Sequence, residues 1–274
     1  MRLLCWSVGG RLGAAAGKQI DAVLGNAPDV LALQGISKGN HPDWHAALTG
    51  AGYSVLSALE LLDAPYPEMA PPIRRRYCSL TAARGSIAPL PGLTFEDPAE
   101  AATAFPEQYL AALVELPGES PVELHNTEVP PGETLGVIKM QALAAIRRRI
   151  DSSPERPRVL CGDFKAPHAE DEDGITVWTA GHPKLREQWE AAERSLLADP
   201  NLRDAYRECR EPGTPLPVSY LTRGTRHRYD HVLASRDLDV IACRYLSDWR
   251  TRKLSEHSPV EAELANSKRR SEAG

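Results

Sequence analysis

The sequence has no apolar run long enough to cross a bilayer and no strong excess of either charge. A transmembrane helix needs about 20 consecutive apolar residues, and no stretch of this 274-residue chain approaches that length. The 32 Lys and Arg residues against 37 Asp and Glu residues leave a net charge of −5. This balance excludes a polybasic nucleic-acid coat, although a local basic groove would still be compatible with it. The opening MRLLCWSVGG shows no cleavage-site pattern, and we expect a cytoplasmic protein without membrane contact.

Recognised cysteine and nucleotide motifs are also missing. The five cysteines are odd in number, lie far apart and form no C-x-x-C pair, which argues against a disulfide framework or a zinc site. The chain contains neither a G-x-x-x-x-G-K-[ST] phosphate loop nor a G-x-S-x-G nucleophile elbow. We therefore expect the cysteines to be small buried residues and look for function elsewhere.

Segments of strand and helix character alternate along the chain, and no internal repeat is visible. With 42% apolar residues, the chain can bury a sizeable core. Short apolar runs bounded by turn residues predict strands at 2–8, 30–33, 53–57, 77–83, 109–116, 122–127, 158–161, 229–234, 240–246 and 259–264. Apolar residues at helical spacing predict helices at 14–24, 42–48, 133–150 and 182–197. We expect residues 1–265 to form a single domain and residues 266–274 a polar, disordered tail.

Polar residues follow several of these predicted strands, where a rigid sheet can project them into a shared site. They are Ser7, Gln34, Asn126 with Glu128, Asp163 with Lys165, Asp230, and Glu256 with His257. A single acid at a strand end is more often a turn or cap former. The ordered set of such residues indicates a functional site.

Five of these stretches carry a family resemblance that covers nearly the whole chain, from Leu4 to Leu264. They are CWSV at 5–8, LALQGI at 31–36, GDFK at 162–165, RYDHVL at 228–233 and LSEHSP at 254–259. Their order and spacing resemble the endonuclease/exonuclease/phosphatase superfamily, whose fold is DNase I-like. The resemblance implies an α/β (α+β) fold, a four-layer α/β/β/α sandwich of two mixed β-sheets flanked by helices. It also implies hydrolysis of phosphoester bonds with a divalent metal, usually Mg²⁺.

Five of the eight positions that can be aligned depart from the functional residues of that family. Ser7 stands in place of the usual Asn, and Gly35 in place of the metal-binding Glu. Glu256 replaces the Asp of the Ser-Asp-His motif. Glu128 replaces a His and Lys165 replaces an Asn, at two positions that normally contact the scissile phosphate. The resemblance therefore indicates a divergent member with a rebuilt site.

Three positions keep the family residue. Asp163 is the usual water-activating carboxylate, and Asp230 with His257 resembles the Asp-His dyad of the family. A carboxylate beside an imidazole raises the pKa of the His and fixes its tautomer, so this dyad can do acid-base work near neutral pH. Asp163 and Glu256 leave only a weak possibility for Mg²⁺ or Mn²⁺, because the main metal ligand is lost. We expect no resident cofactor.

The substituted positions favour a metal-independent enzyme that acts on a small polar metabolite. A phosphate about 4 Å from Glu128 would meet a repulsion on the order of 4 kcal/mol at an effective dielectric constant near 20, which disfavours ordinary nuclease activity. Lys165 could serve as an electrostatic anchor or as a tuned amine, with Glu128 as proton acceptor. The expected catalytic residues are Asp163, Lys165, Glu128, Asp230 and His257, and the expected substrate contacts are Ser7, Tyr220 and Arg228.

Two alternatives remain open at this point. The first is an inactive pseudoenzyme that binds nucleic acid or protein, in which an ion pair of Glu128 with Lys165 merely seals the site. Its candidate phosphate contacts are Arg74, Arg75, Arg76, Arg223, Arg226 and Arg228. The second is a residual Mg²⁺- or Mn²⁺-dependent phosphodiesterase or nuclease. A small-molecule substrate is favoured over nucleic acid, and the oligomeric state is not predicted.

Overall fold

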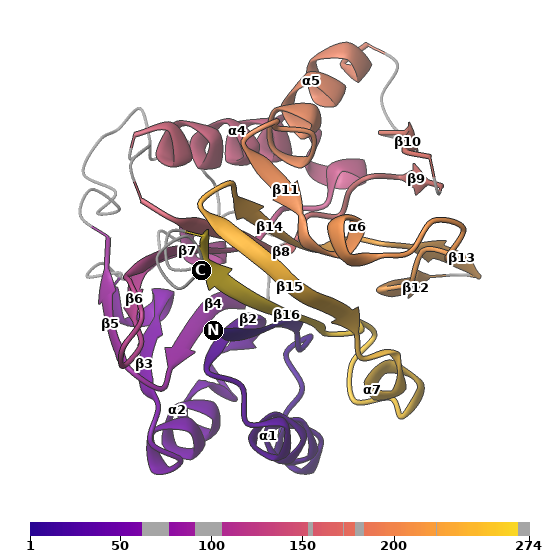
Figure 1. The fold of residues 1–274 in the computed structure, drawn as a ribbon. Helices are drawn as coiled ribbons and strands as arrows, with labels where there is room; N and C mark the ends of the chain where they lie inside the picture. Colours follow the sequence, from indigo (N-terminus) through magenta and orange to yellow (C-terminus); the bar gives the residue numbers. More distant parts are fainter. Residues whose placement is uncertain are drawn as a thin grey trace.

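Two six-stranded β-sheets pack face to face, and helices cover the outer face of each sheet (Figure 1). This architecture is the predicted four-layer sandwich of two mixed sheets. It is seen in a computed structural model that describes residues 1–61, 77–90, 106–152, 156–171, 173–178, 184–222 and 224–267. Four of the candidate nucleic-acid contacts, Arg74, Arg75, Arg76 and Arg223, lie outside the described residues.

The first sheet is built around a parallel pair of strands. Strands β1 (Arg2–Ser7) and β2 (Val30–Ser37) run side by side, with Ser7 opposite Gln34. The remaining pairs are antiparallel and complete the order β15-β16-β1-β2-β4-β3. The other four strands are β3 (Ser54–Ser57), β4 (Tyr77–Ala83), β15 (Leu238–Tyr245) and β16 (Val260–Asn266).

The second sheet also has one parallel pair near its centre. Strands β7 (Val122–Glu128) and β8 (Arg158–Asp163) run parallel, with Glu128 opposite Asp163. The order β11-β14-β8-β7-β6-β5 is completed by β5 (Ser86–Pro89), β6 (Tyr109–Glu115), β11 (Leu202–Asp204) and β14 (Asp230–Ser235). The carboxyl ends of both parallel pairs meet at one edge of the sandwich, where they line a common cavity.

Alternation along the strands explains why the central strands are apolar on both faces. In β1, Leu3 and Cys5 pack between the sheets, whereas Leu4 and Trp6 pack toward the outer helices. Successive residues of a strand point to opposite faces, so a strand in the middle of four layers buries both sets. The predicted buried cysteines are confirmed for Cys5, Cys78 and Cys161, whereas Cys209 and Cys243 are partly exposed.

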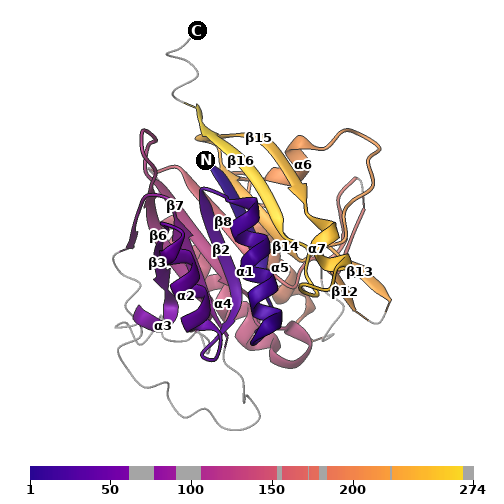
Figure 2. The ribbon, with the colours of Figure 1, turned by 90° about the horizontal axis from the view of Figure 1, so that it is seen from below.

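The helices form the two outer layers. Helices α1 (Ala14–Asn26) and α2 (His41–Gly50) pack on the first sheet, and Figure 2 shows them side by side. Helices α4 (Gly132–Asp151) and α5 (Arg186–Leu197) pack on the second sheet (Figure 1). Within the described ranges, none of the helices combines the length and apolar character that crossing a membrane requires.

Short elements connect the layers. The small helices are α3 (Ala58–Leu61), α6 (Ala205–Cys209), α7 (Ser247–Thr251) and the 3₁₀ turn η1 (Pro106–Gln108). Two hairpins lie outside the main sheets, one formed by β9 (Ala169–Glu170) and β10 (Ile175–Val177) and the other by β12 (Tyr220–Thr222) and β13 (Thr225–His227). The sequence did not predict these short helices and hairpins, because each is too short to show the spacing of apolar residues that marks a helix or a strand.

The longer predicted elements are present with shifted ends. The helix predicted at 182–197 begins at Arg186, and residue 182 lies outside the described residues. The strand predicted at 30–33 continues through a bulge at Gln34 and Gly35 to Ser37. Strand β16 includes Asn266, which the sequence places in the polar tail. The single domain over residues 1–265 stays a prediction.

A buried amide pair joins the two sheets just behind the cavity. Gln34 Nε2 donates to Asn126 Oδ1 at 2.7 Å, and Asn126 Nδ2 donates to the carbonyls of Leu33 and Leu80 at 3.2 and 3.0 Å. Both amide side chains are fully buried. Because buried polar groups are costly unless they are paired, this network fixes the relative position of the strand ends that carry the site.

We expect Asn126→Ala to lower the free energy of unfolding by about 2–4 kcal/mol, because it leaves several buried partners without a hydrogen bond. Urea unfolding monitored by circular dichroism measures this change. The matched control is Ser86→Ala, which removes an exposed hydrogen bond to Glu115 and should change the free energy of unfolding by less than about 0.5 kcal/mol. Equal effects of the two substitutions would contradict the assigned role of Asn126.

Candidate active site

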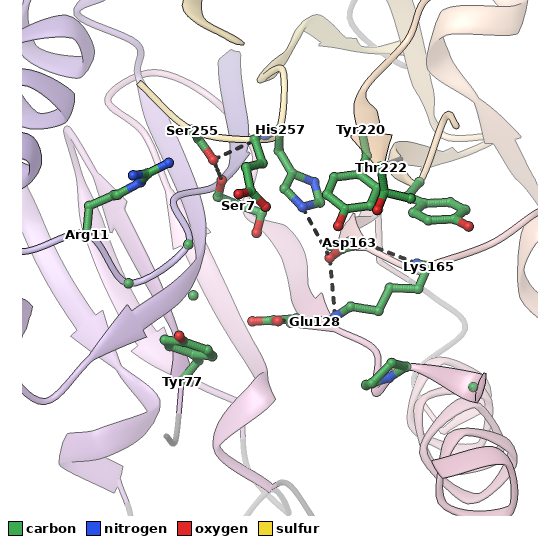
Figure 3. Close-up of a pocket in the computed structure, with 17 residues that line it drawn as sticks. Ser7, Arg11, Tyr77, Glu128, Asp163, Lys165, Tyr220, Thr222, Ser255 and His257 are labelled. Atoms are coloured by element: carbon green, nitrogen blue, oxygen red, sulfur yellow. Dashed lines mark hydrogen bonds and ion pairs between the residues drawn. The ribbon is translucent and has the colours of Figure 1, made fainter. Parts of the chain in front are cut away.

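A cavity of about 580 Å³ opens where the parallel strands of both sheets end (Figure 3). Its floor carries Glu128, Asp163 and Lys165 from the second sheet. Figure 3 shows Arg11 and Tyr77 across the cavity from Lys165. The structure therefore brings together strand-end residues that are far apart in the sequence.

Lys165 lies at the centre of this floor and contacts two carboxylates. Its Nζ is 3.1 Å from Glu128 Oε1 and 3.3 Å from Asp163 Oδ2, and it donates to the Val129 carbonyl at 3.0 Å. The backbone of Lys165 is left-handed, with φ of +49°, and its N–H donates to Asp163 Oδ1 at 3.1 Å. This turn after β8 folds the Lys165 side chain back over the strand end that carries Asp163.

The environment of Lys165 favours its charged form. Burial opposes the charge, but the carboxylates of Asp163 and Glu128 outweigh it and raise the pKa of the Lys165 ammonium above its ordinary value. A nucleophilic amine needs a lowered pKa to lose its proton near pH 7. The geometry consequently supports the predicted role of Lys165 as an electrostatic anchor. It argues against the alternative role of Lys165 as a nucleophilic amine with a lowered pKa. The same ammonium offsets part of the charge of Glu128, so the repulsion expected from that carboxylate is reduced.

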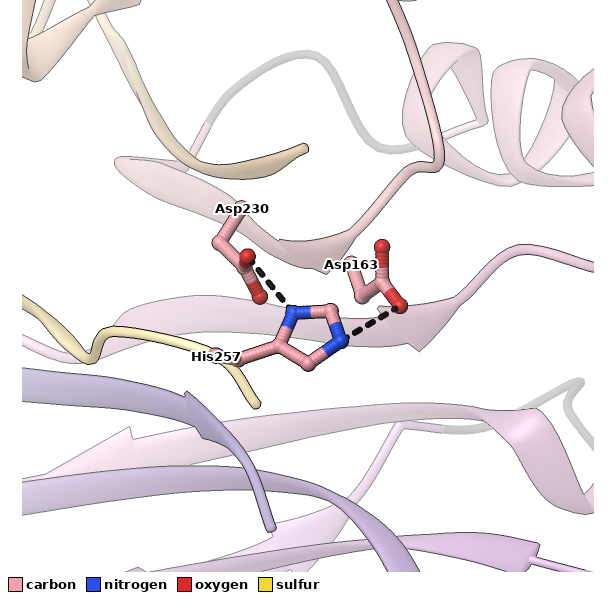
Figure 4. A group of neighbouring side chains, drawn as sticks. All are labelled: Asp163, Asp230 and His257. Carbon is pink, nitrogen blue, oxygen red and sulfur yellow. Dashed lines mark hydrogen bonds and ion pairs between the residues drawn. The ribbon is translucent and has the colours of Figure 1, made fainter. Parts of the chain in front are cut away.

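His257 lies between two aspartates, as Figure 4 shows. Its Nδ1 is 2.8 Å from Asp230 Oδ2, and its Nε2 is 3.9 Å from Asp163 Oδ2. Burial disfavours the imidazolium, but Asp230 and then Asp163 raise the pKa of His257 to about 9. The predicted dyad is thus joined to Asp163, and His257 carries a positive charge at neutral pH.

Tyr220 packs on the face of His257. The two rings are stacked with their centroids 4.5 Å apart, and Tyr229 stacks with Tyr220 at 5.7 Å. Hairpin β12/β13 is held against the loop of His257 because Ser258 N donates to the Ser219 carbonyl at 2.7 Å. The imidazole is therefore fixed by a hydrogen bond at its edge and by an aromatic ring on its face.

Across the cavity from Lys165, part of the wall is formed by the backbone of Gly9, Gly10 and Gly35. Gly35 has φ of +73°, and a Cβ atom built on it would lie 2.8 Å from the backbone N of Gly9. Gly10 N donates to the Gly35 carbonyl at 2.8 Å. The loop after β1 therefore packs closely against Gly35, the position for which the family resemblance implies a metal-binding Glu. Ser7 and Glu256 also line this part of the cavity, Ser7 buried and Glu256 exposed.

Arg228 requires a correction, because it is not in the wall of the cavity. Its guanidinium is buried, and Nη2 lies 2.6 Å from both Glu170 Oε1 and Asp204 Oδ2. Neighbouring residues of an extended segment point in opposite directions, so Tyr229 faces the cavity and Arg228 faces away from it. Of the six arginines proposed as nucleic-acid contacts, Arg226 is the exposed one in the described part of the chain.

The donor set does not fit the divalent metal that the family resemblance implies. Asp163, Asp230 and His257 do present ligand atoms within 4.8 Å of one another (Figure 4). However, His257 is protonated at neutral pH with its ring nitrogens toward the two aspartates. Lys165 already places a positive charge 3.3 Å from Asp163. A divalent cation would have to displace the His257 proton and overcome repulsion from the ammonium.

Comparison with solved structures confirms the fold predicted from the resemblance. An AP endonuclease from Archaeoglobus fulgidus superposes with a TM-score of 0.70 at 18% identity, covering 96% of this chain and 99% of that chain. The 3′ phosphatase NExo from Neisseria, bound to product DNA hairpin, gives 0.67 at 21% identity and covers 96% and 99%. A humanized D. rerio TDP2 gives 0.66 at 13% identity and covers 97% and 99%.

The chain thus has the fold of the endonuclease/exonuclease/phosphatase, or DNase I-like, proteins. A fourth structure, described as an endonuclease/exonuclease/phosphatase from Beutenbergia cavernae, gives a TM-score of 0.59 at 18% identity over 97% of this chain and 71% of that chain. No protein-family model matches the sequence, and no curated protein matches it.

Several residues of the cavity were not predicted from the sequence. They are Gly9, Gly10, Arg11, Tyr77, Pro131, Gly132, Thr222, Tyr229 and Ser255. Tyr229 directly precedes Asp230 in one of the matched stretches, which could have identified it. The approach of Gly9 and Gly10 to Gly35 depends on the pairing of β1 with β2, which no local pattern reveals.

We expect Asp230→Asn to lower the pKa of His257 from about 9 toward its ordinary value of 6.5, because it removes the closest negative charge. NMR titration of the histidine ring signals measures the shift. Because folding raises the pKa of His257, its interaction with Asp230 stabilises the folded protein fully below about pH 6.5. This stabilisation disappears as the pH rises through about 9. The control Asp43→Asn changes an exposed residue of α2. An unchanged pKa of His257 in Asp230→Asn would overturn the assignment.

We expect Gly35→Ala to lower the free energy of unfolding by about 1–3 kcal/mol, because of its positive φ and the close approach of Gly9. The matched control is Gly17→Ala in α1, where an added Cβ meets no atom within 4 Å. That change should raise the free energy of unfolding by about 0.5–1 kcal/mol. Urea unfolding of both variants measures these changes. An unchanged free energy of unfolding in Gly35→Ala would show that the loop of Gly9 can move away from position 35.

Proposed function

We propose that this protein is a hydrolase of the phosphoesterase type that acts on a small polar metabolite without a resident divalent metal. Lys165 and His257 supply the positive charge that the related fold obtains from its cation. The observation that carries the proposal is the position of Lys165 Nζ, 3.1 Å from Glu128 and 3.3 Å from Asp163. A fixed cation in a cavity stabilises negative charge that develops on a reacting phosphoryl group.

The retained residues can divide the chemical step among them. Asp163 accepts the proton of the attacking water, and the oxygen of that water bonds to phosphorus. Asp230 orients His257, whose imidazolium and the Lys165 ammonium donate hydrogen bonds to the phosphoryl oxygens as the bond to the leaving oxygen breaks. The leaving oxygen takes its proton from solvent water. Asp163 then loses its extra proton to solvent and is ready for another cycle.

The shape and charge of the cavity favour a small substrate. About 580 Å³ is within the range of small-molecule sites. The Glu128 side chain lines the cavity and is 12% exposed, so a hydroxyl or amino group of a substrate can bind beside it. Ser7 and Tyr220 are proposed to complete the substrate contacts.

A second candidate function is binding of a DNA end without turnover. It is favoured by the names of the structural neighbours, which include an AP endonuclease and a 3′ phosphatase bound to product DNA hairpin. Against it, the described candidate contacts provide one exposed arginine, Arg226. This candidate requires no reaction from Lys165 or Asp163, and salt-dependent affinity is its signature.

Hydrolysis of small chromogenic phosphomonoesters and phosphodiesters, with a chelator or with added Mg²⁺ or Mn²⁺, tests the proposal. We expect turnover that persists in the chelator and falls by at least about 100-fold in Asp163→Asn and Lys165→Met, because each change removes a group that acts on the reacting atoms. The control Lys18→Met alters an exposed lysine of α1 and should leave turnover unchanged.

Each other outcome supports a different function. Turnover that requires Mg²⁺ or Mn²⁺ and vanishes in the chelator would show that the inherited metal mechanism persists. Absence of turnover together with salt-sensitive binding of a DNA hairpin would support the second candidate. Neither result is compatible with the metal-independent hydrolase.

A further inference from the structure

A buried ion pair lies directly behind Lys165, between the two helices that cover the second sheet. Lys139 of α4 and Glu193 of α5 are each 1% exposed, and Lys139 Nζ is 2.7 Å from Glu193 Oε1. Burying such a pair costs so much desolvation that apolar residues of similar volume often stabilise a protein equally well or better. Stability alone therefore gives no reason for this pair.

The ammonium of Lys139 makes a further contact that points toward the site. It donates to the backbone carbonyl of Lys165 at 2.9 Å. Glu193 Oε1 also accepts from Trp189 Nε1 at 2.6 Å, which fixes the carboxylate that holds Lys139. We call Lys139, Glu193 and Trp189 the clamp. It connects the outer helices to the peptide unit that begins at Lys165.

The clamp and the cavity share a wall. A Cβ atom on Gly132 would lie 1.6 Å from the ring of Trp189, and one on Gly136 would lie 3.2 Å from it. These glycines allow the ring to lie against the first turns of α4, and Gly132 also lines the cavity. The ring therefore sets how close α5 and Glu193 come to the turn after β8.

We infer that the clamp is a positioning device for Lys165, an inference that rests on the proposed function of Lys165 as the fixed cation. Lys165 is one of three non-glycine residues with positive φ in the described ranges, at +49°, a conformation that L-residues adopt at a cost. The hydrogen bond from Lys139 to its carbonyl holds that conformation. From it, the Lys165 side chain reaches back to Glu128 and Asp163.

The decisive variant replaces both charges with apolar residues, in Lys139→Met combined with Glu193→Leu. Because neither charge is left unpaired, the double variant is expected to fold, and thermal unfolding verifies this. We expect kcat for the chelator-resistant hydrolysis to fall by about 10- to 100-fold, as displacement of a catalytic group by about 1 Å produces. KM should change by less than about threefold, since the cavity wall itself is intact.

A second readout works without turnover. The rate at which an amine-acylating reagent modifies Lys165, measured by mass spectrometry, reports how firmly its ammonium is held between the carboxylates. We expect Lys165 to react at least about 10-fold faster in the double variant, because release from the ion pairs restores an ordinary lysine pKa. The exposed Lys18 of α1 is the internal reference and should keep its rate.

A milder variant keeps the test valid if the double variant fails to fold. Trp189→Phe retains an aromatic ring against Gly132 and removes only the Nε1–H that holds Glu193. Its effects on kcat and on acylation of Lys165 should have the same direction and a smaller size. If the folded variants leave the acylation rate of Lys165 unchanged relative to Lys18, the clamp has no positioning role. If acylation of Lys165 rises but neither the unmodified protein nor any variant shows hydrolysis, the positioning role of the clamp is supported and the proposed hydrolase activity is contradicted.

Discussion

The charge of Lys165 is the feature on which the rest of the site depends. Its ammonium lies within 3.3 Å of both Glu128 and Asp163, two carboxylates that face each other across the parallel strands β7 and β8. Two adjacent carboxylates at a buried strand end repel each other unless a cation lies between them. A metal ion usually provides that cation in proteins with this kind of chemistry. Here the Lys165 ammonium lies between them, and in the proposed hydrolase it serves as that cation.

The proposed function links Gly35, where the family resemblance implies a metal-binding Glu, with Lys165, where it implies an Asn. Gly35 lets the loop after β1 approach so closely that a side chain at this position would collide with the backbone of Gly9. In the proposed hydrolase, backbone fills that space, so no side chain at position 35 helps to hold a cation beside the carboxylates of the second sheet. Lys165 restores the balance from the opposite side of the cavity, with support from Lys139 behind it.

Local patterns in the sequence predicted the longer strands and most of the strand-end residues, whereas the four-layer sandwich was predicted from the family resemblance. Apolar runs that end at Ser7 and Asp163, and one that begins at Asp230, define strands and also place these polar residues at one edge of the sandwich. Arg228 was misplaced because its neighbour Tyr229, and not Arg228 itself, faces the cavity. The clamp was missed although Lys139 lies four residues before the buried Leu143, a spacing that places it on the apolar face of α4. Its partner Glu193 is 54 residues away, and no local pattern pairs the two.

The charge count at the site explains why its residues are interdependent. Glu128, Asp163 and Asp230 contribute three negative charges, and Lys165 with a protonated His257 contributes two positive charges. Removing either positive group raises the excess of negative charge among these five residues from one to two, which would strengthen the repulsion of an anionic substrate. Removing Asp230 instead lowers the pKa of His257, so that less of the imidazole carries a positive charge. Asp230 therefore acts on a substrate indirectly, through His257. In the proposed hydrolase, binding of a phosphoryl group therefore depends on the protonation of His257 as well as on Lys165, and it should weaken as the pH rises through the pKa of about 9.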